Sequence, residues 1–164
     1  MLVWLLLLTM TLAPPQRVRE ERPIVPKGYT LVTGEALPEW LVWRNTYRSL
    51  TEPIMAETLD MSPEQRELVV TVAKRVAAAE DTNRARQQRT LDEMTAAGKP
   101  WTEAKPVLKS IDLEHRILTL QERDALLEQL TPEARLELKR WAQRKRQTTK
   151  AYVRTEDLEQ YYLP

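Results

Sequence analysis

The chain has 164 residues, of which 42% are hydrophobic and 30% charged, and its formal net charge is +1. A chain of this length makes one helical domain with large solvated faces, and its near-neutral charge gives no general argument for a nucleic acid or an acidic substrate. It has no cysteine and only 3 glycines, which excludes disulfides, cysteine-ligated metals and glycine-rich phosphate loops.

An apolar run from Leu2 to Leu12 opens the chain. Its length suits the hydrophobic core of a signal peptide and is too short to cross a bilayer as a helix, and Thr11 and Ala13 fit a cleavage site after Ala13. We therefore expect residues 1–13 to be a signal peptide, and the mature protein to be periplasmic or secreted without a transmembrane span. An uncleaved interfacial anchor and a misassigned start codon are the alternatives, because no Lys or Arg precedes the run and Pro14 would follow the cut.

Residues 14–36 are rich in proline and also contain glycines and a cluster of charges, which predicts an extended arm or linker. Pro38 and Glu39 then open a short helix that Pro53 ends or kinks. Its large side chains recur at spacings of three and four, in one stripe: Trp40, Trp43, Tyr47 and Leu50. The aromatic stripe is interpreted either as packed core of a helical bundle or as a docking surface for a partner.

The second helix is predicted from Ser62 to the stop at Gly98-Lys99-Pro100, with Ser62 and Gln65 arranged as a capping box and Pro63 and Glu64 in the first turn. Such a helix is about 50 Å long. Its buried stripe begins with valines and turns polar midway, which predicts weak or hydrated packing there: Leu68, Val69, Val72, Val76, Ala79, Asn83, Gln87, Thr90 and Met94.

A third helix is predicted from about Glu103 to Leu130, and its two apolar stripes favour contact with two neighbours. One stripe contains Leu108, Ile111, His115, Leu118 and Ala125, and the other contains Leu113, Ile117, Leu120 and Leu127. A fourth helix begins at Thr131, Pro132 and Glu133 and presents one face made of Ala134, Leu138, Trp141 and Tyr152.

The expected fold is therefore all-α: a long helical hairpin with flanking shorter helices, preceded by an extended Pro-rich arm. The helical domain spans residues 37–153, and residues 154–164 form a C-terminal tail.

The two helix starts are near copies of each other. Leu59-Asp60-Met61-Ser62-Pro63-Glu64-Gln65 and Leu130-Thr131-Pro132-Glu133-Ala134 resemble the LTxxQ motifs of the Spy/CpxP family, over about residues 59–146. Met61 and Ser62 stand where the motif has Leu and Thr, and Ala134 stands where the second copy has Gln. The resemblance implies a periplasmic, all-helical protein built on a long hairpin, often an antiparallel dimer, that acts as an ATP-independent chaperone, an envelope-stress regulator or a metal-linked sensor.

A chaperone surface combines mobile apolar groups with long cationic side chains, and four arginines of the second helix fit that description: Arg75, Arg84, Arg86 and Arg89. A charged face that is merely solvated is the simpler interpretation. The chain has 1 His and no Cys, which argues against a transition-metal sensor. No metal or other cofactor is expected.

Catalysis has little support. Asp112 and His115 share a helix face, but a four-helix dinuclear site needs a second histidine, and no nucleophile elbow is present. The fourth helix is the most basic region, with cations including Arg135, Lys139 and Arg146; export argues against a nucleic-acid partner and leaves an anionic membrane or polymer open.

The sequence therefore predicts a non-enzymatic, exported binding protein. Its partners are protein clients, met in a chaperone-like way, or one fixed envelope protein docked through the aromatic or basic helix, and a homodimer is an open alternative.

Overall fold

The computed structural model describes residues 24–163, so the expected signal peptide lies outside the described residues. The fold is mainly α-helical, as predicted. Its helices are α1 (Glu39–Leu50), α2 (Pro53–Glu57), α3 (Pro63–Ala96), α4 (Trp101–Gln129), α5 (Pro132–Thr148) and α6 (Leu158–Tyr161). Two strands, β1 (Tyr29–Thr33) and β2 (Lys150–Arg154), form an antiparallel pair, and each is followed by a 3₁₀ turn, at Gly34–Ala36 and Thr155–Asp157.

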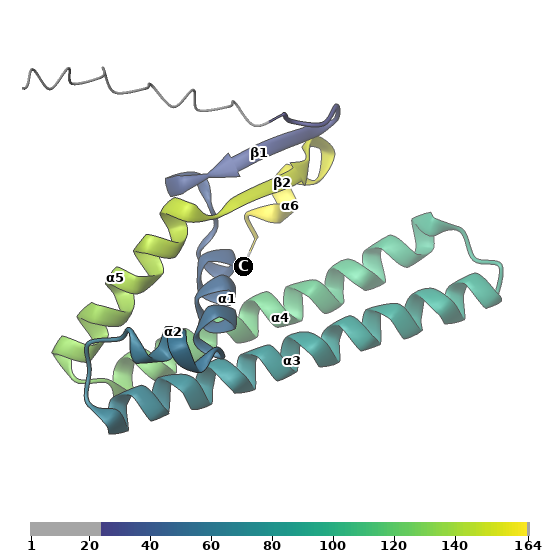
Figure 1. Ribbon diagram of the computed structural model, residues 1–164. Helices are drawn as coiled ribbons and strands as arrows, with labels where there is room; N and C mark the ends of the chain where they lie inside the picture. The colour runs from purple at the N-terminus through teal and green to yellow at the C-terminus, as the bar shows by residue number, and fades with distance from the viewer. Residues whose placement is uncertain (1–23, 164) are drawn as a thin grey trace, which may run out of the picture.

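Helices α3 and α4 form the predicted long hairpin, and Figure 1 shows its distal half extending beyond α1 and α5. The turn between them contains Gly98 with a φ of +65°, a conformation that favours glycine at a helix end. At the start of α3, Ser62 Oγ accepts a hydrogen bond from the Gln65 amide at 3.3 Å. Thr131 Oγ1 does the same for the Ala134 amide, also at 3.3 Å, so both predicted caps are confirmed.

The two near-identical helix starts also contact each other. Gln65 does not return to its own helix start as a capping box requires; its Oε1 accepts a hydrogen bond from the Thr131 amide at 2.9 Å. The arginine that follows each motif binds carbonyls before its own cap: Arg66 donates to Leu59 and Met61, and Arg135 donates to Leu130. The paired segments thus fasten the start of α3 to the end of α4.

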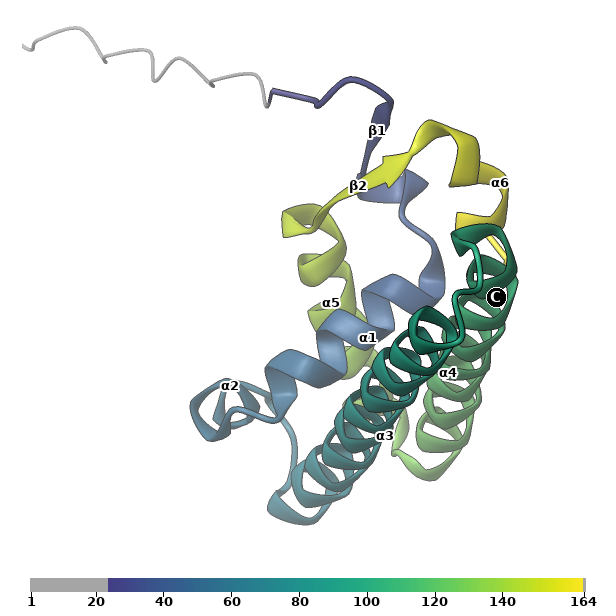
Figure 2. The ribbon, with the colours of Figure 1, turned by 90° about the vertical axis from the view of Figure 1, so that its right-hand side faces the viewer.

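Helix α1 lies between the hairpin and α5, and it packs on α3, α4 and α5 (Figure 2). Its aromatic stripe is almost completely buried: Trp40 is 5% exposed, Trp43 4% and Tyr47 0%. These side chains join the valines of α3 and the apolar face of α5 in one core. The packing interpretation of the stripe therefore agrees with the structure, and the stripe offers no exposed surface to a partner.

The α3–α4 seam changes character along its length. Val69, Val72 and Val76 are buried near α1, whereas Asn83, Gln87, Thr90 and Met94 are half-buried. Gln87 Nε2 donates to the Leu108 carbonyl at 3.2 Å, which satisfies one polar group of the distal seam. The predicted loss of apolar packing toward the tip is therefore present.

Only one of the two stripes predicted for α4 is largely buried. Ile111 and His115 face the interior, but Leu113 is 36% exposed and Ile117 40% exposed, and Ala125 is exposed as well. The second-stripe prediction is wrong for Leu113 and Ile117, because in the described structure Leu113 borders a cavity in place of a closely packed helix and both side chains stay more than one-third exposed.

The predictions for the arm and for the end of the fourth helix are wrong in part, because each of these regions contains a strand. Tyr29–Thr33 pairs with Lys150–Arg154, so that Leu31 lies opposite Tyr152. Tyr152 had been placed on the fourth helix, but α5 ends at Thr148 and Thr149 is already extended. Val32 and Val153 are buried on the inner face of this pair, which explains why the alternating residues fold back as strands. The residues after Val153 fold as a turn and α6 rather than trailing as a tail.

We expect Gln65→Ala to lower the free energy of unfolding by about 1 kcal/mol, because the Thr131 amide loses its partner. Gln121→Ala is the matched control, since Gln121 is exposed on α4 and gains the same helix propensity without losing a contact; its change should stay within about 0.5 kcal/mol. Urea unfolding followed by circular dichroism measures both. Equal effects of the two substitutions would show that the contact between the motifs contributes nothing.

Candidate functional site

The candidate site lies between α4 and the last residues of the chain, Thr155–Leu163, which we call the C-terminal segment. The segment follows directly after β2, and the pairing of β2 with β1 fixes the direction in which it runs to reach α4. The Thr155 amide donates to the Gly28 carbonyl at 3.0 Å, and the hydroxyls of Thr155 and Thr30 lie 3.2 Å apart. Two parts of the chain that are far apart in the sequence are thus joined at the point where the segment begins.

A group of three charges holds the start of the segment. Asp157 lies 2.8 Å from Lys109 Nζ and 3.2 Å from Lys105 Nζ, and Glu156 lies 3.5 Å from Lys105. Lys109 also donates to the Gln160 side chain. We call this group, Lys105, Lys109 and Asp157, the clasp. It is partly solvated, so its strength falls with added salt.

Arg116 holds the end of the segment by its main chain. Its guanidinium donates to the carbonyls of Gln160 at 2.8 Å, Tyr161 at 3.3 Å and Leu163 at 3.3 Å. These carbonyls lie in or just beyond the last turn of α6, where helical partners are lacking. Asp112 pairs with Arg116 at 2.5 Å and keeps the guanidinium oriented.

Trp40 connects the segment to the core. Its indole N–H donates to the Tyr161 carbonyl at 3.1 Å, and the Trp40 and Tyr161 rings meet edge to face with centroids 5.5 Å apart. Arg116 lies over the Trp40 ring, 4.2 Å from its centroid. Burial raises the pKa of the Tyr161 hydroxyl to about 12, so this ring is neutral at physiological pH.

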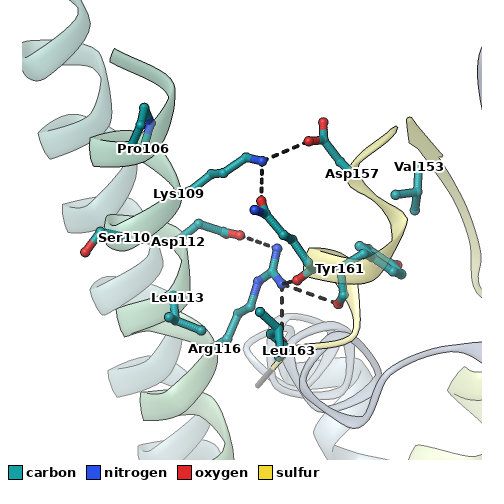
Figure 3. Close-up of a pocket in the computed structure, with 11 residues that line it drawn as sticks. Pro106, Lys109, Ser110, Asp112, Leu113, Arg116, Val153, Asp157, Tyr161 and Leu163 are labelled. Carbon is teal, nitrogen blue, oxygen red and sulfur yellow. Dashed lines mark hydrogen bonds and ion pairs between the residues drawn. The ribbon is translucent and has the colours of Figure 1, made fainter. Parts of the chain in front are cut away.

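Between α4 and the C-terminal segment is a cavity of about 460 Å³, which we call the α4 groove (Figure 3). Its walls are mostly apolar, from Pro106 and Leu113 on α4 and from Val153 and Leu163 opposite. The charges of the clasp and Arg116 lie along its rim. A groove of this size, with apolar walls and a few polar groups, suits a short peptide segment or a small amphipathic molecule.

The groove does not bring Ser110 and the chain's histidine together. Ser110 lines it, but His115 lies five residues further along α4 and is buried on a different side of the helix. Within residues 24–163, no three His, Cys, Asp or Glu side chains gather closely enough to hold a metal ion. What the groove offers chemically is apolar contact, the Lys109 cation with Lys105 one helical turn away, and the Arg116 donors for main-chain carbonyls.

Three of the four arginines predicted as a partner surface on α3 are engaged by carboxylates. Arg75 pairs with Glu122, Arg84 with Glu80 at 2.5 Å and Arg86 with Glu114 at 2.5 Å. Arg89 is exposed and has no ion pair among the described residues. The carboxylates neutralise most of this face, which weakens its attraction for acidic segments.

Some cations of α5 are paired with other helices, whereas others have no ion pair within the described residues. Arg146 is buried, donates to the Leu37 carbonyl at 2.9 Å and pairs with Glu39, so it joins α5 to α1. Lys139 and Arg140 are exposed, and neither has an ion pair within the part of the chain that the structure describes. The predicted basic surface is therefore smaller than the sequence indicates.

The α4 groove was missed from the sequence because four of its eleven lining residues come from the part of the chain predicted to be a tail. The sequence did contain a signal for β2, the alternating residues Lys150-Ala151-Tyr152-Val153-Arg154. Alternation of polar and apolar residues, which puts residues of one kind two positions apart, is typical of a strand. The groups of the segment itself, acidic and then aromatic, gave no local indication of where they would dock.

Comparison with protein-family models, with curated proteins and with solved structures gives no match to the chain. The resemblance to the Spy/CpxP family thus remains a hypothesis based on the two motifs. No helix within residues 24–163 is both long and apolar enough to cross a membrane.

Docking of the C-terminal segment should depend on pH through Asp157. The hydrogen bond from Lys109 lowers the pKa of Asp157; burial partly opposes this, and Lys105 lowers the pKa further. A depressed folded-state pKa means that ionised Asp157 stabilises docking above the ordinary carboxyl pKa and that this contribution is lost as pH falls through the depressed value. We expect docking to be constant from about pH 6 to 8 and to weaken below about pH 4.

The NMR resonance of the Trp40 indole N–H reports this change, because the group binds the Tyr161 carbonyl. Asp157→Asn should already be loosened at neutral pH and should show a smaller acid transition. An unchanged transition in that variant would assign it to other carboxylates.

Proposed function

We propose that this chain is an exported, non-enzymatic helical protein that binds protein clients in a chaperone-like way, similar to the Spy/CpxP family. The observation that carries the proposal is the α4 groove with its open apolar border. Leu113 of α4 and Leu163 of the C-terminal segment line it and are 36% and 53% exposed, and Ile117, one helical turn beyond Leu113, is 40% exposed. An exposed apolar strip next to a groove is a feature of protein-binding surfaces.

The composition of this surface suits weak binding of unfolded segments. Leu113 and Ile117 offer flexible apolar contact, while Lys105 and Lys109 carry long apolar stems with charged ends. Such a surface binds exposed apolar groups and attracts acidic ones without demanding one sequence. No nucleotide site is needed for this activity, because binding and release are set by affinity alone.

The compartment is inferred from the sequence. The apolar run from Leu2 to Leu12 supports export, and the absence of cysteine is compatible with an oxidising compartment. The paired motifs that begin α3 and α5 support the family relation, since they make the contact through Gln65 and Thr131 that fastens the base of the hairpin.

A second candidate is docking to one fixed envelope protein through α5. The exposed side chains Leu136, Lys139 and Arg140 favour it, because they form an uncovered face with cations free of ion pairs in the described structure. Crosslinking that recovers a single partner, and that is lost in Lys139→Glu/Arg140→Glu, would support this function over the chaperone-like one.

The purified protein should suppress aggregation of a chemically unfolded client without ATP at a several-fold molar excess. We expect Leu113→Gln/Ile117→Gln to weaken suppression several-fold, because the apolar border of the groove is lost while glutamine keeps good helix propensity. Leu136→Gln is the matched control: it removes an exposed leucine from α5, away from the groove, and should leave suppression unchanged. Light scattering measures all three, and circular dichroism checks their folding.

No suppression by the wild-type protein would reject the chaperone-like function. Equal losses in the α4 and α5 variants would show that general surface hydrophobicity, rather than the groove, binds the client.

A further inference from the structure

The C-terminal segment is itself a peptide lying along a binding surface. Its sequence places acidic residues first and aromatic and apolar residues last: Glu156, Asp157, Glu159, Tyr161, Tyr162 and Leu163. The acidic end meets the lysines of α4, and the apolar end reaches the groove and Trp40, as Figure 3 shows for Asp157, Tyr161 and Leu163. The chain's own C-terminal segment thus shows which kinds of group this face of α4 binds: a carboxylate, main-chain carbonyls and an aromatic ring.

The contacts that hold the segment are of a kind that another peptide can reproduce. Lys105 and Lys109 bind a carboxylate, Arg116 binds three main-chain carbonyls, and the Trp40 indole binds one of the same carbonyls. Only the carboxylate and the aromatic ring demand particular side chains. Recognition of the main chain is independent of sequence, so the acidic and aromatic positions set the specificity.

The segment is also incompletely packed. The cavity of about 460 Å³ separates much of it from α4, and Tyr162 and Leu163 are 47% and 53% exposed. Leu158 and Tyr161 pack on the core, but the other contacts of the segment are solvated ion pairs and exposed side chains, which means a lower free energy of local opening than for the core helices. Displacing the segment therefore costs less than disrupting the core beneath it.

Displacement would leave the groove positively charged. Among the described residues, the ion-pair partners of Lys105 and Lys109 all belong to the C-terminal segment, whereas Arg116 keeps its own partner, Asp112. The vacated face would present two free ammonium groups beside the apolar wall of Leu113. Its complement is a carboxylate followed by an aromatic or apolar side chain.

We propose that the α4 groove binds acidic–aromatic segments of partner polypeptides in place of the C-terminal segment, which acts as a built-in competitor. The inference rests on the proposed function in using the same groove, and it names the class of client segment. Because the competitor is tethered, its effective concentration is high and the apparent affinity for a client falls by the fraction of time the groove is occupied.

A fluorescently labelled synthetic peptide of residues Thr155–Leu163, titrated into the full-length protein and followed by anisotropy, tests this. Asp157→Lys in the protein repels the tethered segment from Lys105 and Lys109 but leaves the α4 face unchanged, so the peptide should bind about tenfold more tightly than to the wild type. Glu159→Lys is the matched control: it makes the same charge change in the same segment, where Glu159 has no ion pair with other described residues, and should bind as the wild type does.

A second comparison tests the docking mode. Lys109→Glu alone places a carboxylate opposite Asp157, so it repels both the tethered segment and the natural peptide, which should bind severalfold more weakly than it binds to Asp157→Lys. A peptide carrying Lys at the Asp157 position should recover affinity for a protein with Lys109→Glu alone. This reversal depends on the charge pair and would not follow from a general loss of stability.

Several results would overturn the proposal: equal peptide binding by the wild type and Asp157→Lys, equal gains from Asp157→Lys and Glu159→Lys, or no effect of Lys109→Glu. A wild-type dimer that exchanges C-terminal segments and takes up no peptide would assign the groove to a second copy instead. Peptide binding without suppression of client aggregation would reject the chaperone-like function and keep the ligand class. Suppression of client aggregation without peptide binding would keep the chaperone-like function and reject the proposed class of client segment.

Discussion

Burial of the aromatic face of α1 is the interaction on which the rest of the molecule depends. The distal seam of the α3–α4 hairpin has few buried apolar residues and is joined by polar contacts such as those of Gln87 with the Leu108 carbonyl and of Arg86 with Glu114. Helix α5 contacts the hairpin largely through α1. Trp43 and Tyr47 fill the space between these helices, while Trp40 reaches the C-terminal segment. Large rings at helical spacing bury much apolar area for little loss of side-chain entropy, which suits a helix that must contact several neighbours.

Polar contacts complete this arrangement where the apolar ones end. Buried Arg146 pairs with Glu39, whose carboxylate also accepts from the Trp43 indole at 3.1 Å, so α5 and the aromatic helix share one ionic group. At the base of the hairpin, the hydrogen bond from the Thr131 amide to the Gln65 side chain joins the start of α3 to the end of α4. The C-terminal segment differs because, apart from the packing of Leu158 and Tyr161 on the core, charged and main-chain contacts hold it beside a cavity. It is therefore the element whose docking is most sensitive to salt, pH and competition.

The parts of the fold that follow from local rules could be predicted from the sequence. Ser62 and Thr131 mark helix starts because caps act within one turn, and the α3–α4 hairpin follows from two long periodic segments. The strand pair could not be predicted in the same way, because Leu31 and Tyr152 meet across most of the chain and each strand has only five residues. The helical period of α5 happens to extend through Tyr152, so the pattern concealed the change to extended backbone after Thr148.

The same limit explains why the proposed binding surface lies on other residues than expected. Sequence identifies an amphipathic face or a run of arginines, but whether a face is covered and whether a charge is paired are decided by segments far along the chain. The stripe containing Trp40 became core, and Arg86 gained a carboxylate from the neighbouring helix at Glu114. Leu113, by contrast, was expected to be buried and was left uncovered. We infer that a surface can bind a partner where its apolar side chains are left uncovered and its charges are paired only with a weakly held segment. In the described residues, the α4 groove meets both conditions: Leu113 is partly exposed, and Lys105 and Lys109 pair with the C-terminal segment.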